Sequence, residues 1–191
     1  MKQIRNDQKI STKLFNKTLK EIMATIGIFY GSTDGNTERV VTKIHEQLGG
    51  DGAATLHNVN SASADDMAPY TTIILACPTW EIGQLQDDWN GFIDELDDVD
   101  FNGKKVTYVG LGDADGYPDT FLDALGIIHD RVKDKGATFV GAWPTDGYEF
   151  EGSKGVVDGK FLGLAIDEDN QKDLTEGRIS KWVAQLKGEL G

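Results

Sequence analysis

The chain has 191 residues, 39% of them hydrophobic, and a formal net charge of −13 at pH 7. This composition is enough for one ordinary soluble core, and no apolar run approaches the ~18 residues that insert as a membrane span. The negative charge argues against nucleic acid and anionic membranes as partners, and the single cysteine, Cys77, excludes an internal disulfide and a cysteine-rich metal site.

The first 22 residues differ in charge from the rest of the chain. They carry six basic side chains against Asp7 and Glu21, a net of +4, so residues 23–191 carry −17. Their apolar residues lie roughly on one helical face, which predicts a basic amphipathic helix. We interpret residues 1–22 as an extension and 23–191 as the domain. Three interpretations of the extension stay open: Met23 is the real or an alternative start of the protein, or the extension is a targeting segment, or it is a functional tail.

The strongest motif is the stretch from Ile26 to Thr37, IGIFYGSTDGNT. It opens with an apolar, β-prone run that Gly31 ends, which predicts a buried strand. Apolar residues then recur at helical spacing over 40–48, so a helix begins near Thr37. The loop between them combines free backbone N–H groups with the positive end of a helix dipole, an arrangement that binds anions.

The residue types in this loop narrow the identity of the anion. A triphosphate loop ends in Gly-Lys-Ser/Thr, and the chain has Gly35-Asn36-Thr37 instead. The glycines also lack the spacing of a dinucleotide fingerprint. The remaining donors are backbone N–H groups and the hydroxyls of Ser32, Thr33 and Thr37, which suit one terminal phosphate monoester. The alternative is a small-residue turn that binds no ligand.

Strands and helices alternate along the rest of the domain. Further strands are predicted at 53–59, 71–77, 105–111 and 138–143, and helices at 89–96, 120–135 and 174–190. The run TTIILAC at 71–77 is continuously apolar, as in strands buried on both faces of a parallel sheet. The order predicts a five-stranded α/β doubly wound sheet, whose ligands bind beyond the carboxyl ends of the strands.

Two loops at that edge carry aromatic residues. Trp80 follows the third strand, and Tyr117 follows the fourth. Two aromatic side chains at a ligand edge can sandwich a flat conjugated ring system. The alternative for either residue is that its side chain fills space in the hydrophobic core, as a core plug. At the same edge as the anion loop, the pair indicates a mononucleotide with a large planar base.

Residues 23–191 resemble the long-chain flavodoxins, which are FMN-binding electron carriers. The matching segments are IGIFYGSTDGNT, CPTWEIGQLQDDW, DDVDFNGKKV, GLGDADGYPDTF and GKFLGLAIDEDNQKDLTEGRISKWVAQLK. The Gly- and acid-rich segment 144–169 resembles the insertion that separates the long-chain from the short-chain group. The resemblance implies a flavodoxin-like sheet of order 2-1-3-4-5, helices on both faces and one non-covalent FMN.

The resemblance also implies which residues hold the FMN. Residues 32–37 would bind the phosphate, Trp80 and Tyr117 would stack on the inner and outer ring faces, and Asp146 would approach the ribityl chain. The implied cofactor-binding residues are Ser32, Thr33, Asp34, Gly35, Asn36, Thr37, Thr79, Trp80, Glu81, Ile82, Gly83, Leu111, Gly112, Asp113, Tyr117 and Asp146. The chain departs from the family at Leu111, where Thr is usual, and at Glu81, where Asn, Gly or Asp is usual.

The implied function is low-potential electron transfer, with one or two electrons carried on FMN in the place of ferredoxin. The implied partners are basic redox proteins such as ferredoxin-NADP reductase, and photosystem I or another ferredoxin-dependent system. We expect a cytoplasmic monomer, or one in the plastid stroma if residues 1–22 belong to a targeting peptide.

Two alternatives come from other classes of protein. A flavodoxin-like NAD(P)H:quinone reductase needs a second substrate pocket beside the flavin, and no loop indicates one. A signalling module of the response-regulator type needs an acceptor aspartate at the end of the third strand, where the chain has Ala76-Cys77-Pro78.

Overall fold

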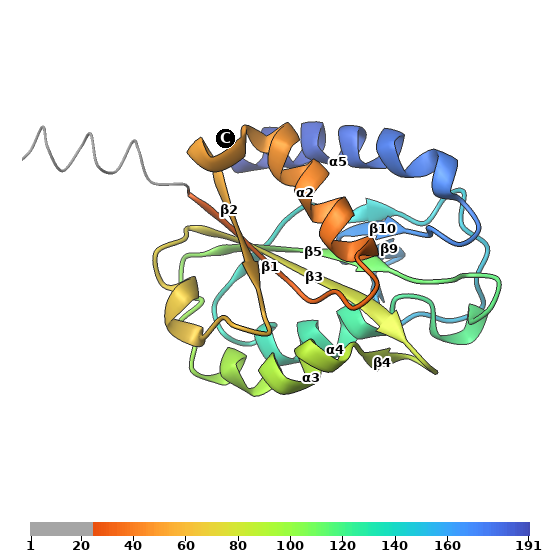
Figure 1. Ribbon diagram of the computed structural model, residues 1–191, viewed down its shortest axis with the longest axis horizontal. Helices are drawn as coiled ribbons and strands as arrows, with labels where there is room; N and C mark the ends of the chain where they lie inside the picture. Colours follow the sequence, from red (N-terminus) through yellow and green to blue (C-terminus); the bar gives the residue numbers. More distant parts are fainter. Residues whose placement is uncertain (1–24) are drawn as a thin grey trace, which may run out of the picture.

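The computed structural model describes residues 25–191 and shows a parallel sheet between two layers of helices (Figure 1). The predicted extension, residues 1–22, lies outside the described residues. The sheet runs in the spatial order β2, β1, β3, β5 and β10, and every neighbouring pair in that order is parallel. The strands are β2 (Ala54–Asn58), β1 (Ile26–Tyr30), β3 (Thr72–Trp80), β5 (Lys105–Leu111) and β10 (Leu164–Ile166). The predicted fold class and its 2-1-3-4-5 order are confirmed.

Helices cover both faces of the sheet. Helices α2 (Asn36–Leu48) and α5 (Thr175–Leu190) pack together on one face, and α3 (Asp87–Phe92) and α4 (Asp123–Val132) lie on the other (Figure 1). The buried residues of α2 recur at helical spacing over 40–48, so one stripe of the helix faces the sheet while the charged stripe faces solvent.

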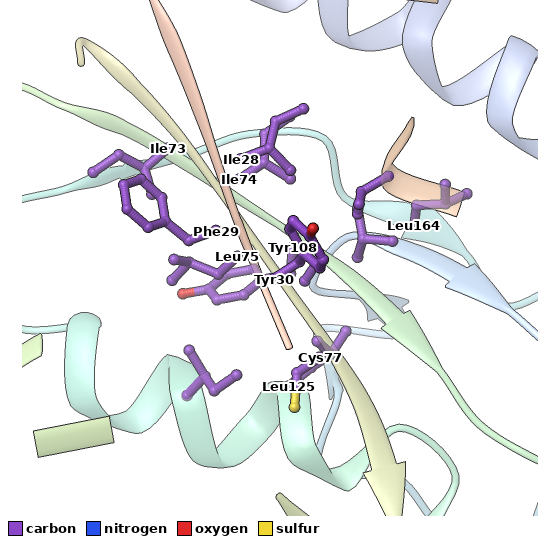
Figure 2. Packing of buried hydrophobic residues seen from close by; sticks show 14 of the residues in the cluster. Ile28, Phe29, Tyr30, Ile73, Ile74, Leu75, Cys77, Tyr108, Leu125 and Leu164 are labelled. Carbon is purple, nitrogen blue, oxygen red and sulfur yellow. The ribbon is translucent and has the colours of Figure 1, made fainter. Parts of the chain in front are cut away.

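Side chains from several strands and α4 meet in one core (Figure 2). Ile28 of β1, Ile74 of β3 and Tyr108 of β5 have no exposed surface. Strands buried on both faces lose the alternation of polar and apolar residues, which is why the third strand reads as one apolar run. Cys77 belongs to this core, and its burial raises the pKa of its thiol. It is therefore a small buried hydrophobe and not a nucleophile.

The third strand is longer than predicted. The sequence predicts it over 71–77, whereas β3 continues to Trp80 and turns back into β4 (Gln84–Leu85). A proline is tolerated at position 78 because β1 ends opposite Ala76, and only β5 still pairs with β3 there as a parallel neighbour. Trp80 therefore lies on a strand at the carboxyl edge of the sheet.

The fifth strand is split, so the prediction of one strand over 138–143 is wrong. The first part of β5 pairs with β6 (Thr138–Phe139), and its last part pairs with β10. The chain between them forms a separate antiparallel sheet of β7 (Trp143–Pro144), β9 (Lys160–Phe161) and β8 (Val156–Val157). The segment 144–169, expected to be an insertion, therefore contains the second half of a sheet strand.

Gly163 returns the chain to the main sheet. A Cβ atom at this position would lie 1.9 Å from the carbonyl oxygen of Tyr108, so the returning backbone approaches β5 more closely than a side chain allows. The spacing of apolar residues does not predict that the chain rejoins the main sheet here, because β10 has only three residues.

Gly163→Ala should therefore lower the free energy of unfolding by about 3 kcal/mol, since a strand carbonyl has to move. Gly177→Ala in α5 is the control, because nothing lies within 4 Å of its added Cβ atom. It should raise the free energy of unfolding by up to about 1 kcal/mol. Urea denaturation measures both variants, and equal effects would contradict the steric argument.

Candidate cofactor site

A cavity of about 280 Å³ lies beyond the carboxyl ends of β1, β3 and β5, where doubly wound sheets bind their ligands. Its lining includes most of the predicted residues: Ser32, Thr33, Asp34, Asn36, Thr37, Thr79, Trp80, Glu81, Leu111, Gly112, Asp113 and Tyr117. It also includes residues that the sequence analysis did not predict: Pro78, Thr120, Phe121, Leu122, Glu168 and Asp169.

The other predicted residues lie outside this lining. Gly35 and Gly83 have positive φ angles and shape the turns beside the cavity, and Ile82 is 77% exposed. Asp146 is exposed in a turn after β7. Besides Asp34, Glu81 and Asp113, the carboxylates in the cavity wall come from Glu168 and Asp169, in the segment that follows β10. An acidic run marks this segment in the sequence, but the segment around Asp146 is acidic as well, so the pattern does not tell the two apart.

The loop after β1 forms a cradle of donors. Among residues 25–191, no group accepts a hydrogen bond from the backbone N–H groups of residues 33–37. The next N–H group, from Glu38, donates to the Ser32 hydroxyl at 3.3 Å. Gly35, with a φ angle of 79°, turns the chain into α2. Free N–H groups at a helix N-terminus, with hydroxyls beside them, are the donor set that a terminal phosphate requires.

Gln86 holds this cradle from behind, and the sequence analysis did not identify it. The side chain is 1% exposed, and its Nε2 donates to the Thr33 hydroxyl at 3.0 Å and to Asp88 at 2.8 Å. Because the Thr33 hydroxyl accepts this bond, its own proton stays free for a ligand. Gly31 makes room for the amide, since a Cβ atom there would lie 2.2 Å from its Oε1.

Trp80 and Tyr117 line the same cavity and are only partly covered by protein. Trp80 is half-buried, and Tyr117 is 47% exposed. Tryptophans that plug the core are fully buried, as Trp89 and Trp182 are. Trp80 is therefore no core plug, and the two side chains offer aromatic surface to a flat apolar ligand.

The turn between β3 and β4 holds Glu81 in a left-handed conformation, with a φ angle of 45°. Trp80 pairs with Gln84, so three residues close the turn. Gly83 completes it with a φ angle of 83°, packed so that a Cβ atom would lie 2.9 Å from Oδ2 of Asp123. Glutamate adopts this conformation less readily than glycine or asparagine, so backbone strain lies at the rim of the cavity.

The segment after β10 contributes a wall of carboxylates. Asp167 is buried and accepts a hydrogen bond from the N–H group of Ala114 at 3.1 Å. Asn170 donates to Asp113 at 2.8 Å, and this bond holds the pKa of the Asp113 carboxyl below its ordinary value. Burial and the neighbouring carboxylates raise the pKa of Asp169. Among the described residues, no lysine, arginine or histidine lines the cavity.

Glu81→Gly should raise the free energy of unfolding of the ligand-free protein by about 1 kcal/mol, because glycine adopts the left-handed conformation without strain. Glu81→Ala is the matched control, since it removes the same carboxylate but keeps a Cβ atom. Its stability should stay close to that of the unchanged protein. Urea denaturation compares the three proteins, and equal gains in both variants would assign the effect to charge.

The fold and the cavity define the class: a doubly wound α/β protein that binds a phosphate ester with a flat ring system. The family model for flavodoxin matches residues 28–182. The chain belongs to the flavodoxin family.

Curated relatives and solved structures agree with this assignment. The chain is 54% identical over 166 residues to the flavodoxin of Nostoc sp. (strain PCC 7120 / SAG 25.82 / UTEX 2576), which covers 87% of this chain and 97% of that protein. It is 51% identical over 170 residues to the flavodoxin of Trichodesmium erythraeum (strain IMS101), with 88% and 99% covered. A crystal structure of Fusobacterium nucleatum flavodoxin bound to flavin mononucleotide has a TM-score of 0.81 at 36% identity, and covers 87% of this chain and 99% of that chain.

Proposed function

We propose that the protein carries electrons on one non-covalently bound FMN. The observation behind this proposal is one cavity with a phosphate cradle at one end and two partly exposed aromatic side chains at the other. FMN has the two matching parts, a single terminal phosphate and a planar ring system. Membership of the flavodoxin family supports the same function and does not favour the NAD(P)H:quinone reductase alternative.

The residues of the cavity fit FMN in separate roles. Residues 32–37 would hold the phosphate through N–H groups and hydroxyls, and Trp80 and Tyr117 would flank the ring. The rest of the proposed ring contacts come from five lining residues, Thr79, Glu81, Leu111, Gly112 and Asp113, and from Ile82 and Gly83 in the turn beside the cavity. The side wall along the ribityl chain is assigned to Asp169, which lines the cavity where Asp146 does not.

FMN supplies the electron chemistry, and the chain sets the charge around it. A carboxylate ~8 Å from an added negative charge raises the free energy of adding that charge by about 2 kcal/mol at an effective dielectric constant of ~20. For one electron this corresponds to a potential lowered by about 90 mV. Asn170 holds Asp113 in its ionised form, and no lysine, arginine or histidine of residues 25–191 lines the cavity beside it, so the proposed carrier is strongly reducing.

The proposed partners are basic redox proteins, such as ferredoxin-NADP reductase, and photosystem I or another ferredoxin-dependent system. The charge of −17 on residues 23–191 supports this proposal, because an acidic surface speeds the approach of a basic partner. We propose that the carrier acts as a cytoplasmic monomer. Among the described residues, no helix has both the length and the apolar composition to cross a membrane.

The binding of three flavins tests the cofactor. FMN should bind more tightly than riboflavin, which lacks the phosphate, and more tightly than FAD, whose second phosphate and adenosine do not fit a cradle for one terminal group. Quenching of flavin fluorescence on titration with the protein gives the three dissociation constants. Tightest binding of FAD would contradict the assignment.

Electron transfer tests the function itself. With NADPH and ferredoxin-NADP reductase present, addition of the FMN-loaded protein should accelerate the reduction of cytochrome c. A mixture without ferredoxin-NADP reductase is the control. If the FMN-loaded protein and NADPH alone reduce an added quinone, the result would favour the alternative function as a quinone reductase.

Removal of residues 1–22 should change the FMN dissociation constant and the free energy of unfolding little, because we propose that the domain is complete from residue 23. Thermal and urea denaturation of the full chain and the shortened chain measure the difference. A loss of several kcal/mol, a large share of the stability of a domain, would show that the extension packs on the fold.

A further inference from the structure

Arg39 lies in the first turn of α2, two residues after the phosphate cradle and outside the lining of the cavity. Its Nη2 donates to the Asn36 side chain at 3.0 Å and also pairs with the Glu168 carboxylate. Asn36 and Glu168 both line the cavity. Because one nitrogen atom contacts both side chains, the Glu168 carboxylate lies at the phosphate end.

Glu168 is a carboxylate with little access to water. Its side chain is 8% exposed, and besides Arg39 it accepts a hydrogen bond from the Thr175 hydroxyl at the start of α5. A buried carboxylate needs a partner of opposite charge, since removal from water penalises the ionised form. Arg39 supplies that charge from behind the cavity wall.

The same segment also reaches the ring end of the cavity. Asp167 accepts from the N–H group of Ala114, and Asn170 donates to Asp113. Residues 167–170 therefore connect the loop after β5 with the start of α2. The Arg39–Glu168 pair makes the connection at the α2 end.

A phosphate monoester bound in the cradle carries about −1.5 to −2 charges at neutral pH. Glu168 without a cation would place a further buried negative charge beside it, and like charges at short range in a medium of low dielectric oppose each other strongly. With Arg39 in place, the pair is neutral. The cradle can then bind a phosphate although none of the basic side chains in residues 25–191 lines the cavity.

We propose that Arg39 is a positioning residue that neutralises Glu168 and thereby sets the preference of the site for a flavin that carries a terminal phosphate. This inference rests on the proposed binding of FMN. It assigns the preference to a pair of side chains of which only Glu168 lines the cavity.

The test compares FMN with riboflavin in three variants of the full chain, by quenching of flavin fluorescence. Arg39→Gln should weaken FMN binding about tenfold or more, the cost of leaving a buried charge without its partner, and should change riboflavin binding little. Glu168→Gln should leave FMN binding at least as tight as in the unchanged protein. The double variant should return FMN binding to within about threefold of that protein, because the unpaired charge is gone.

Lys43→Gln is the matched control. Lys43 lies one turn further along α2, pairs with Glu176 of α5 and does not line the cavity. The Lys43→Gln variant removes one positive charge from the same helix as Arg39→Gln does. It therefore separates a general loss of positive charge from the loss of the Arg39–Glu168 pair. FMN binding should stay unchanged in this variant.

A merely structural role for the pair predicts different results. FMN and riboflavin would then weaken together, Glu168→Gln would be as damaging as Arg39→Gln, and the double variant would not recover; each of these results would overturn the inference. Unchanged FMN binding in Arg39→Gln would overturn the inference as well. In that case, tight binding of FMN by the unchanged protein would still support the proposed function. Failure of that protein to bind either flavin would overturn both.

Discussion

The structure depends on β3, the central strand of the sheet, which has parallel neighbours on both sides and is buried on both faces. Because every face of the sheet is covered by helices, polar chemistry is confined to the edge where the strands end. β3 extends beyond β1 at this edge, which carries Trp80 and the strained turn at Glu81 to the cavity. The length of one strand relative to its neighbour thus positions the aromatic end of the site.

The parts of the fold that could be predicted are those whose residues bury a continuous or periodic apolar set. The first strand, its loop and α2 are predictable because apolar run, small residues and helical spacing follow one another within 26–48. The split fifth strand is not, because β10 has three residues and its return depends on the contact of Gly163 with a backbone oxygen. A close approach between distant backbones leaves no periodic signal in the sequence.

The residues of the candidate site also fall into those that could be predicted from the sequence and those that could not. The donors of the phosphate cradle and the two aromatic residues could be predicted, because each follows a predicted strand and the strand ends share one edge. The acidic side wall could not: Asp146 and Asp169 both lie in acidic segments, and only the fold shows that Asp169 lines the cavity. Gln86 and Arg39 act through other side chains, and the partners on which their roles depend, Thr33 and Glu168, are distant in sequence. A pattern along the chain contains no information about such pairs until the elements are packed.

The walls of the cavity are held by groups behind them. Gln86 holds the cradle, Asn170 holds the loop after β5, and Arg39 holds the acidic segment, each through hydrogen bonds or an ion pair within the protein. Such a site is organised before a ligand binds, which lowers the ordering cost of binding. The turn at Glu81 differs, since it is exposed, strained at its φ angle and closed by only three residues. Any adjustment of the backbone to the charge state of a bound flavin is therefore expected in this turn, where strain already reduces the cost of a change in conformation.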